Sequence, residues 1–585
     1  MPASAFYSKR KAGSQGDSTT DESTDTRKRP RDVQHEAQLF LEMLDGLSEK
    51  LDLVFTKFAV KYILKGHYAK EALELLAEPI KQPTGSPDRP EDLEPLKLVV
   101  NILNRRRIEL LELCHAEVEA PTGSGKPNRP LDDRQRALQR GIEAPRPSDA
   151  AKHSVLLVEQ AIRPMQIGRS LGTTGPPISI YHPIFSRFQT LVQGDDSDPV
   201  AEDVVAAWSL ITAAADFYET EDDRLDSMNP YLTTLLGRRI NGTYEMDAYR
   251  PDGVVFTEGI PMGIPLLVME AENEIGAGER DPNFQAAFSY RKLWVERSRF
   301  KIRNACCCPG FVLSVAGPYI TIHGGVYAGD FIVQPLTETL GLANYPAICD
   351  RARYIAKIMV ALRTCLDELE LFYMDVTPTA DTKLMACRSP FFNEYDGYTL
   401  TYTSYNLLSD RIGRAMFDAE VKRDGEEQAI PVRVKFTTEY CHAAHELLAR
   451  ENLAPPLRHV RGLESGWIVV VMDLIPGKDL ATGRPDPLPD RVREDVRKAV
   501  DLLHKEGFAF GDLRPSNIVL CERNLPDGGT EQGVMLVDFD WAGKAGEQRY
   551  PPSLNIRIHW PEGVKPGGIM KKEHDDALFE FLIHP

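Results

Sequence analysis

The chain has 585 residues, of which 42% are hydrophobic and 27% are charged. This length can bury several cores and suggests roughly three to four domain-sized units. The formal net charge of −18 would repel nucleic acid, so any nucleic-acid contact would need a local basic patch. Nine cysteines without paired metal-ligand spacing, no apolar N-terminal segment and no long apolar run predict a reduced, intracellular protein with no membrane partner.

Residues 1–37 have the composition of a disordered basic tail. Basic clusters at 9–11 and 27–31 flank a spacer that is rich in Ser, Thr and Asp and has no core-forming residues. Two clusters at this separation resemble a bipartite nuclear import signal, and the alternative is a solvated charged tail. The sequence therefore predicts an intracellular protein directed to the nucleus.

Residues 38–118 follow a helical apolar pattern, interrupted by a Pro-rich loop at 82–95. We expect an amphipathic helical region that acts as a scaffold or docks a partner. Residues 119–174 are rich in Pro and Gly and are predicted to form a linker.

Residues 175–375 alternate between helical and strand-like patterns. The predicted elements are a helix at 199–219, strands at 244–256 and 265–276, a helix at 282–294 and a strand at 310–325. This order resembles the PD-(D/E)xK nuclease-like fold, an α/β domain. The resemblance implies that Asp252, Glu270 and Glu272 converge to hold a divalent metal.

One position departs from the nuclease pattern. A nuclease of this type needs a cation, normally Lys, two residues after the first Glu, and Glu272 stands there. Lys292 or Arg291 on the following helix could supply the charge, with Gln285 near the start of that helix. We favour a structural α/β domain, and a metal-dependent nuclease that contacts nucleic acid through this region is the alternative.

The region after residue 395 begins with patterns suited to a nucleotide-binding lobe. A strand at 430–436 would direct Lys435 inward toward nucleotide phosphates. The helical segment at 439–457 offers Glu446 as the ion-pair partner of Lys435, although His445 fits the register almost as well. A buried strand at 467–471 leads into a connector, where the backbone from Met472 to Gly477 would bind adenine. Gly413 is the one glycine of the expected phosphate-binding loop, so the backbone of this loop can approach phosphates less closely than a glycine-rich loop can.

The segment 508–520 places three polar residues in a short loop between apolar runs. A kinase needs a carboxylate that accepts the proton of the substrate hydroxyl, two magnesium ligands and a cation near the transferred phosphoryl group. Asp512 fits the first role, Asn517 and Asp538 fit the magnesium ligands, and Arg514 fits the cation. The spacing of Asp512 and Asn517 alone also suits a capped turn, but the strands that follow favour phosphoryl transfer.

Residues 395–585 resemble the fungal-type protein kinase family, a divergent branch of the two-lobed protein-kinase-like fold. The matching stretches read VKF, HAAHELLA, GDLRPSNIV, VDFDWAGKAGEQRYPPSLN and HWPEGVKPGGIMKKEHDD. The resemblance implies that Lys435 binds ATP phosphates, Asp512 is the catalytic base, and Asn517 and Asp538 bind Mg²⁺. It also implies that Asp575 anchors the catalytic loop from a following helix.

The sequence as a whole predicts a multidomain α/β and α+β protein whose C-terminal domain transfers phosphoryl groups from ATP to Ser or Thr hydroxyls of a protein. The acceptor protein is not named by any motif, and the middle domain could regulate the kinase. Phe510 replaces a common His, Asp540 replaces the usual Gly after the DF pair, and the phosphate-binding loop is poor in Gly. These departures keep a second hypothesis open, a pseudokinase that serves as a nucleotide-binding scaffold.

Overall fold

The computed structural model describes residues 133–584, except 170, 195–198, 245–248, 261–262, 345, 381–386, 405–413, 424, 427, 525–529 and 556–557. The predicted basic tail, the predicted helical region 38–118 and Gly413 lie outside the described residues. Within the described residues, no helix combines the length and the apolar character needed to cross a membrane.

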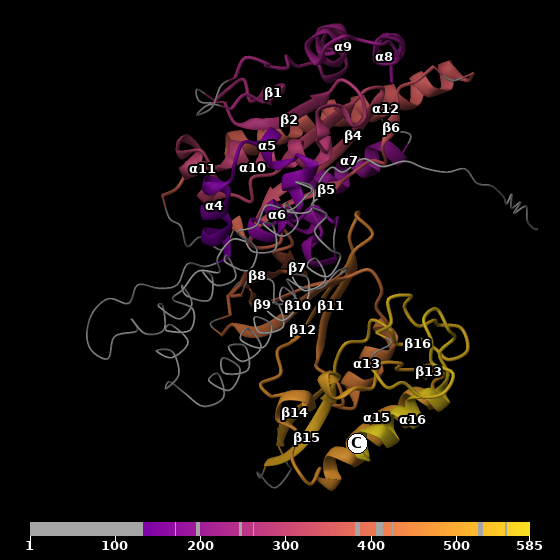
Figure 1. Cartoon of the computed structure of the whole chain (residues 1–585). Coiled ribbons are helices and arrows are strands. Elements are labelled where there is room, and N and C mark those ends of the chain that lie inside the picture. Colours follow the sequence, from indigo (N-terminus) through magenta and orange to yellow (C-terminus); the bar gives the residue numbers. More distant parts are fainter. Residues whose placement is uncertain are drawn as a thin grey trace, which may run out of the picture. The chain divides into compact units, whose positions relative to one another are not determined.

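The elements keep the labels of Figure 1. The helices are α4 (Asp133–Glu143), α5 (Pro147–Ala150), α6 (His153–Ile162), α7 (Ile184–Gln193), α8 (Ala201–Ala214), α9 (Glu221–Leu236), α10 (Pro282–Val295), α11 (Phe300–Ala305), α12 (Ile348–Asp375), α13 (His442–Arg450), α14 (Leu480–Gly483), α15 (Asp490–Lys505) and α16 (Lys572–Ile583). The strands of the middle region are β1 (Gly253–Phe256), β2 (Pro265–Glu272), β3 (Gly310–Ala316), β4 (Tyr319–Tyr327), β5 (Phe331–Pro335) and β6 (Leu340–Gly341). The later strands are β7 (Glu394–Tyr395), β8 (Tyr398–Tyr402), β9 (Arg414–Arg423), β10 (Ile430–Thr437), β11 (Leu457–Gly462), β12 (Ile468–Asp473), β13 (Phe508–Ala509), β14 (Ile518–Asn524), β15 (Thr530–Leu536) and β16 (Gly543–Lys544).

The middle region is built on a mixed sheet with the strand order β1-β2-β3-β4-β5, and β6 pairs with β4. β2 and β3 are parallel and are connected through α10, whereas β1 pairs with β2 and β4 pairs with β3 in antiparallel fashion. Every residue of β2 is buried, and α9, α10 and α12 all contact this strand. A strand buried on both faces explains the continuous apolar run that the sequence shows there. The predicted order of helix, two strands, helix and strand is present.

The prediction of a linker at 119–174 is wrong for its described part. α4, α5 and α6 lie within it, and α4 and α5 pack on α10. Arg134 of α4 is buried, and its guanidinium donates to the carbonyl oxygens of Cys387 at 3.4 Å and Cys306 at 3.2 Å. α4 and α5 are short and polar, so their stability comes from packing and from buried hydrogen bonds that composition does not reveal.

A second six-stranded sheet, called the N-terminal sheet because it precedes α15, has the strand order β11-β12-β10-β9-β8-β7, and its pairs are antiparallel. Along β10, the side chains of Val432, Val434 and Phe436 are fully buried in the core. Lys435 alternates with them, so it leaves the sheet on the opposite face. Its backbone lies between Met416 of β9 and Val470 of β12.

α15 is the main helix of the C-terminal part. Its apolar stripe of Val492, Val496, Val500 and Leu503 is buried. The chain turns just after α15 at Gly507, whose φ of 81° lies in the left-handed region that favours glycine. The turn leads into β13 and then into the polar loop that begins after it.

The buried side chains form two main clusters. One extends from the middle sheet to the N-terminal sheet and includes both Phe311 and Phe436. The other lies beneath α15 and holds Phe510 and Phe539. Contacts group all described residues into one compact unit, so the predicted domain limits at 375 and 395 remain predictions.

Candidate active site

A cavity of about 410 Å³ opens between the N-terminal sheet and the loop that follows β13. β9, β10 and β12 supply one side of it, and the segments around Asn517 and Asp538 supply the other. The residues that line it are Arg414, Met416, Arg433, Lys435, Pro455, Met472, Asp473, Leu474, Ile475, Gly477, Asp479, Arg514, Ser516, Asn517, Val519, Val537 and Asp538. Five of the residues that the sequence singled out for phosphoryl transfer therefore line a single hollow: Lys435, Met472, Arg514, Asn517 and Asp538. Asp512 does not line it but binds Arg514, which does.

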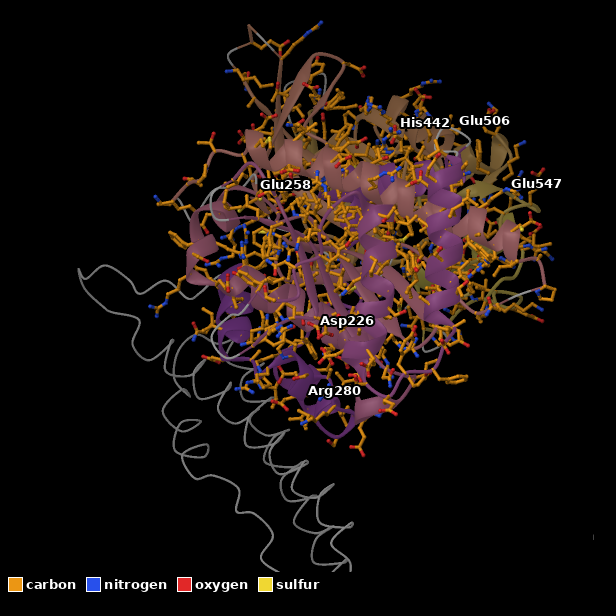
Figure 2. All side chains as sticks on the ribbon, turned by 90° about the horizontal axis from the view of Figure 1, so that it is seen from above. Asp226, Glu258, Arg280, His442, Glu506 and Glu547 are labelled. Carbon is orange, nitrogen blue, oxygen red and sulfur yellow. The ribbon has the colours of Figure 1, made fainter. Side chains whose placement is uncertain are left out.

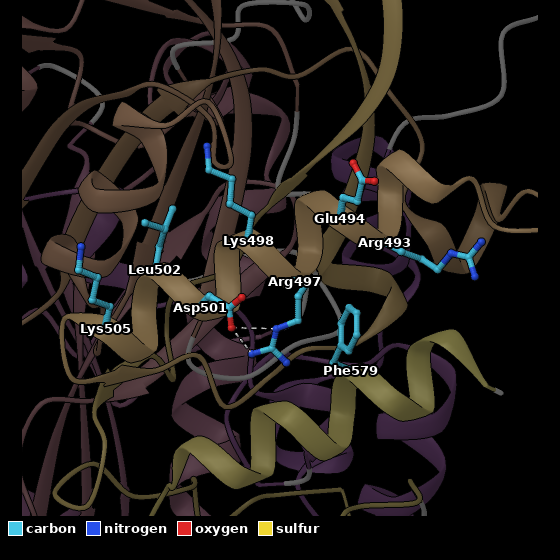
Figure 3. Close-up of a pocket in the computed structure, with 8 residues that line it drawn as sticks. All are labelled: Arg493, Glu494, Arg497, Lys498, Asp501, Leu502, Lys505 and Phe579. Carbon is cyan, nitrogen blue, oxygen red and sulfur yellow. Dashed lines mark hydrogen bonds and ion pairs between the residues drawn. The ribbon is translucent and has the colours of Figure 1, made fainter.

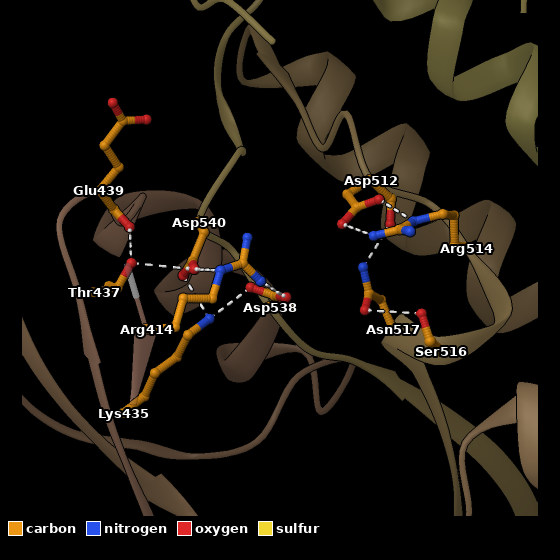
Figure 4. A network of polar contacts seen from close by, with 10 residues as sticks. All are labelled: Arg414, Lys435, Thr437, Glu439, Asp512, Arg514, Ser516, Asn517, Asp538 and Asp540. Carbon is orange, nitrogen blue, oxygen red and sulfur yellow. Dashed lines mark hydrogen bonds and ion pairs between the residues drawn. The ribbon is translucent and has the colours of Figure 1, made fainter. Parts of the chain in front are cut away.

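A buried network of four charges lies at the inner end of this cavity (Figure 4). The Lys435 ammonium donates to Asp538 Oδ1 and to Asp540 Oδ1, each at 2.6 Å. The Arg414 guanidinium donates to Asp538 Oδ2 at 2.9 Å and lies 3.3 Å from Asp540 Oδ2. Two cations of the sheet thus face two carboxylates of the segment after β15, and the formal charges cancel.

The two carboxylates respond differently to this environment. Burial alone would raise the pKa of Asp538, but the charges of Lys435 and Arg414 outweigh it and hold the pKa below the usual value. Burial, together with repulsion from Asp538, raises the pKa of Asp540 to about 6 despite the same two cations. Asp538 is therefore the member of the pair that keeps its charge to lower pH.

The backbone at Asp538 is in the left-handed region, with φ of 69°. This conformation is uncommon for residues other than Gly, although Asp and Asn tolerate it best. It occurs where the chain leaves β15 and turns the carboxylate toward Lys435. Strain held at such a position is typical of functional sites.

The polar loop after β13 is organised around Asp512, which is almost fully buried. Arg514 forms a two-pronged ion pair with it, with Nη2 at 2.6 Å from Oδ2 and Nε on Oδ1. The Asn517 amide donates to the Asp512 carbonyl oxygen at 2.9 Å. Burial raises the pKa of Asp512, and the charge of Arg514 opposes that shift. The loop thus brings together Asp512, Arg514 and Asn517, the three loop residues that the sequence singled out for phosphoryl transfer (Figure 4).

Aromatic side chains enclose the Arg514 side of the loop. The guanidinium of Arg514 lies 5.6 Å from the ring centroids of Trp541 and of Trp560. Such contacts favour a cation and restrict its motion. Phe510 packs edge-on against Phe539 at 5.4 Å, so packing supports the loop at the position where a His is common.

Asp575 of α16 anchors the loop, as the family resemblance implied. Its carboxylate accepts the backbone N–H groups of Phe510 at 2.7 Å and Gly511 at 2.8 Å, and His504 Nε2 lies 3.2 Å away. Gly511 has φ of 75°, and a Cβ there would lie 2.7 Å from the Met570 sulfur. Glycine is therefore required at this position by the backbone and by the close approach of Met570.

We expect Asp575→Asn to lower the free energy of unfolding by about 3 kcal/mol, because an amide group would face backbone donors that now bind a buried carboxylate. The neighbouring Asp576→Asn is the matched control. Asp576 is half exposed and pairs with Arg497 at 2.9 Å, so its loss should cost less than about 1 kcal/mol. Denaturant unfolding of the full chain measures both, and equal effects would contradict the anchoring role.

The predicted pair of Lys435 and Glu446 is not formed. Glu446 is about half exposed, and its carboxylate pairs with Arg450 at 3.1 Å on the outer face of α13. His445 occupies the inner face instead and is fully buried. The sequence left both registers open, and the stacking of His445 on Phe539 at 4.6 Å accounts for the one adopted.

His445 is held as a neutral ring. Its Nε2 lies 2.8 Å from the Pro455 carbonyl oxygen and must donate to it, so Nδ1 accepts from the Tyr440 hydroxyl. Burial lowers the pKa of His445 to about 4.

This shift predicts a pH-dependent effect of His445→Gln. In the unfolded chain His445 takes up a proton near pH 6.5, whereas the folded chain resists protonation until near pH 4, so its stabilising contribution falls as the pH drops between these values. The destabilisation caused by His445→Gln should therefore be smaller at pH 5 than at pH 7, by about 2 kcal/mol. Denaturant unfolding of both proteins at the two pH values measures the difference, and a pH-independent effect would refute it.

Met472 differs from its predicted place in the connector. β12 extends to Asp473, so the Met472 backbone pairs within the sheet opposite Arg433, while the residue lines the cavity. The backbone N–H groups of Asp473 and Leu474 donate to the carbonyl oxygens of Pro456 and Pro431 at 3.0 and 3.1 Å. The part of the connector that lies beyond these hydrogen bonds begins at Ile475.

Sequence reasoning missed one site residue, Arg414. It begins β9 directly after the predicted phosphate-binding loop, and its side chain joins the network of Lys435. The signal that could have found it was the strand pattern from 414 to 423, which points alternate residues to one face.

A second hollow, of about 570 Å³, lies along α15 beside Phe579 of α16 (Figure 3). Several of its charged side chains bind one another or their neighbours. Arg497 Nε donates to Asp501 at 2.9 Å, and Lys498 donates to Glu451 at 2.9 Å. No member of the Lys435 network lines this hollow, so it is separate from the candidate active site.

The acids of the middle region come together, but as a core group. Glu270 is buried and accepts hydrogen bonds from Gln285 at 2.7 Å, from Ser289 at 2.5 Å and from Tyr249. Asp252 accepts the backbone N–H of Ala271 at 2.7 Å. Burial raises the pKa of both Glu270 and Asp252. Among the described residues, no group of three or more acids, His or Cys is arranged to hold a metal ion.

The expectation that Lys292 or Arg291 supplies a cation to these acids is wrong. Lys292 donates to carbonyl oxygens at the end of α4, including that of Ala144 at 2.5 Å, and Arg291 pairs with Glu159 at 3.2 Å. Arg280, labelled in Figure 2, pairs with Glu272 at 3.2 Å instead. Lys292 and Arg291 of α10 thus bind groups of α4 and α6, the short helices within the predicted linker.

The fold and this site define a kinase-like region. No protein-family signature matches the chain. The serine/threonine-protein kinase PknF of Mycobacterium tuberculosis is 25% identical over 173 residues, which cover 28% of this chain and 34% of that kinase. A PknF of Mycobacterium bovis matches equally. The chain spans about a third of the length of these curated relatives.

Two solved kinase structures are also similar to the chain. One is the Rio2 kinase complex with ADP, Mg²⁺ and phosphoaspartate from Chaetomium thermophilum, with 13% identity over 25% of this chain and 50% of that one. The other is the kinase PK-1 of Cydia pomonella granulovirus, with 13% identity over 26% of this chain and 57% of that one. Both TM-scores are 0.20, so neither superposition contributes to the assignment. The sequence match to PknF and the site geometry carry it.

Proposed function

We propose that the chain is an ATP-dependent protein kinase that transfers the γ-phosphoryl group to Ser or Thr hydroxyls. The observation that carries the proposal is the contact between a strand lysine and a loop carboxylate across one cavity. Lys435 of β10 meets Asp538 at 2.6 Å, and Arg514 and Asn517 of the Asp512 loop line the same cavity. Phosphoryl transfer needs these groups together, since it depends on positioning and on charge stabilisation.

ATP would lie along this cavity. Lys435 and Arg414 supply two positive charges for its phosphates, and the connector from Ile475 to Gly477 offers backbone groups for adenine. Gly477 packs so closely on β14 that a Cβ would lie 1.9 Å from the Leu520 carbonyl oxygen. The connector is therefore held against the C-terminal part by a contact that only glycine permits.

Asn517 and Asp538 suit Mg²⁺, which prefers oxygen ligands and is commonly held by one or two carboxylates together with phosphates. The Asn517 amide nitrogen donates to the Asp512 carbonyl oxygen, so the amide oxygen is the Asn517 atom that could bind the metal ion. The Ser516 hydroxyl lies 3.3 Å from this amide oxygen. The low pKa of Asp538 keeps its carboxylate ionised. Bound Mg²⁺ would neutralise charge on the β- and γ-phosphates.

Asp512 is the proposed catalytic base. It would accept the proton of the acceptor hydroxyl while that oxygen bonds to the γ-phosphorus, the bond to the bridging oxygen breaks and ADP leaves. Burial raises the pKa of Asp512, which brings the carboxylate closer to the range in which a base works best. Arg514, which now binds Asp512, is placed to turn toward the transferred phosphoryl group.

The assignment to the fungal-type family rests on the sequence stretches that it matches. Two features of the described residues support it. Met570, within the matching tail, packs beneath Gly511 of the loop, and its N–H donates to the Gln548 carbonyl oxygen at 2.8 Å. The tail therefore supports the proposed catalytic loop directly.

Three measurements test the proposal. Calorimetry measures ATP binding with and without Mg²⁺, label transfer from ATP is followed to a generic protein acceptor and to the chain itself, and phosphoamino acid analysis then identifies the hydroxyl. We expect phosphoserine or phosphothreonine. ATP binding without transfer would favour the nucleotide-binding scaffold, and the absence of binding would overturn both.

A further inference from the structure

The proposed kinase site lacks a helix carboxylate for its lysine. Glu446 faces outward to Arg450, and the inner face of α13 presents the neutral ring of His445. An unpaired ammonium group at the buried position of Lys435 would be costly. Some other anion must therefore orient it whenever Asp538 serves as a ligand for a metal ion.

Asp540 is the carboxylate that the structure places there. It is 4% exposed, and its Oδ1 accepts from Lys435 at 2.6 Å. Its Oδ2 lies 3.1 Å from the Thr437 hydroxyl and 3.3 Å from Arg414 Nε. All three partners belong to the N-terminal sheet, so Asp540 joins the segment after β15 to that sheet (Figure 4).

The backbone that carries Asp540 is also fixed. Phe539, one residue earlier, stacks on His445 with an interplanar angle of 6° and meets Phe510 edge-on. The backbone N–H of Cys441, just before α13, donates to the Phe539 carbonyl oxygen at 3.0 Å. His445, which occupies the inner face of α13 in place of a carboxylate, thus packs on the segment that carries Asp540.

We propose that Asp540 is the positioning residue for Lys435, in place of a carboxylate on α13. This inference rests on the proposed function. It assigns one role to each carboxylate, because Asp538 can turn to a metal ion while Asp540 keeps the Lys435 ammonium directed at the phosphates. A glycine at position 540 has no side-chain carboxylate for either cation, so the residue that departs from the usual kinase pattern supplies the anion that α13 does not.

Asp538 and Asp540 also link the position of the Lys435 ammonium to the segment that carries Asp538, the proposed metal ligand. They are two residues apart on one rigid turn, so Lys435 and Asp538 are positioned together.

Asp540→Asn and Glu446→Gln provide the test, because each converts one carboxylate to an amide of nearly equal size. Binding of ATP with Mg²⁺ is measured by calorimetry, and KM and kcat are measured for ATP and for the protein acceptor. Asp540→Asn should weaken ATP binding and raise the KM for ATP by about tenfold, while the KM for the acceptor changes little. Glu446→Gln should change each quantity by less than about twofold.

Thr437→Val is a further variant that removes only the hydroxyl beside Asp540. It should shift the KM for ATP in the same direction by a smaller factor, and it keeps the test open if Asp540→Asn does not fold. Unchanged ATP binding in both Asp540→Asn and Thr437→Val, or an equal loss in Glu446→Gln, would overturn the inference while the kinase proposal stands. A wild-type chain that binds no ATP with Mg²⁺ would overturn both.

Discussion

Asp512→Asn is expected to lower kcat for phosphoryl transfer by about 10²- to 10⁴-fold, the range over which a positioned base contributes. The reason is that an amide cannot accept the proton of the acceptor hydroxyl. Asp512 is not among the residues that line the cavity, so ATP binding should change by less than about twofold. Label transfer and calorimetry on the same preparations separate these two effects.

Asp501→Asn is the control for that experiment. Asp501 is exposed on α15, where it pairs with Arg497 and lines the hollow of Figure 3, which no member of the Lys435 network lines. Its replacement should leave both transfer and ATP binding unchanged. Wild-type turnover in Asp512→Asn would exclude Asp512 as the base.

Asp538→Asn is expected to remove the dependence of ATP binding on Mg²⁺, since the amide supplies a weaker ligand than a carboxylate. Asn tolerates a φ of 69° as well as Asp does, so the turn after β15 should keep its shape. The affinity for ATP measured with Mg²⁺ should fall by about tenfold or more and approach the value measured without it. Calorimetric titrations in both conditions provide the comparison.

Asp473→Asn is the matched control in the same cavity. Asp473 also lines the hollow, but its carboxylate pairs with Arg458 of β11 and not with the Lys435 network. Magnesium-dependent ATP binding should persist in this variant. A loss of the same size in Asp473→Asn would attribute the effect to the general charge of the cavity.

The elements that carry the site could be predicted because their patterns are local. The apolar stripe of α15 and the alternation along β10 each follow from spacing within one segment. The loop from Asp512 to Asn517 was recognisable because phosphoryl transfer requires those residue types close together. What these patterns do not contain is the partner of each charge.

The Lys435 pair illustrates that limit. Glu446 and His445 are neighbours on α13, so either could face inward on periodicity alone. His445 and Phe539, which stack on each other, lie 94 positions apart in the sequence, so no local pattern encodes their contact. The sequence did mark Asp540 as unusual, but its contact with Lys435 appears only when the sheet and the turn after β15 are brought together.

The middle region shows the same limit on a larger scale. The resemblance to a nuclease-like fold implied that Asp252 and Glu270 converge, and in the structure the two carboxylates are close enough for their charges to interact. Lys292 was expected to serve that cluster, yet it binds the carbonyl oxygens at the end of α4. That helix lies in a stretch rich in Pro and Gly, which composition assigned to a linker.

Magnesium-dependent transfer of label from γ-labelled ATP by the wild-type chain is the most direct test of the central claim. The reaction is run with a generic protein acceptor and with the chain alone, in the presence of Mg²⁺ and in its absence. The account predicts label on Ser or Thr hydroxyls only when Mg²⁺ is present. ATP that binds in the cavity and is never consumed under these conditions would contradict a kinase and make the Lys435 network a nucleotide-binding scaffold.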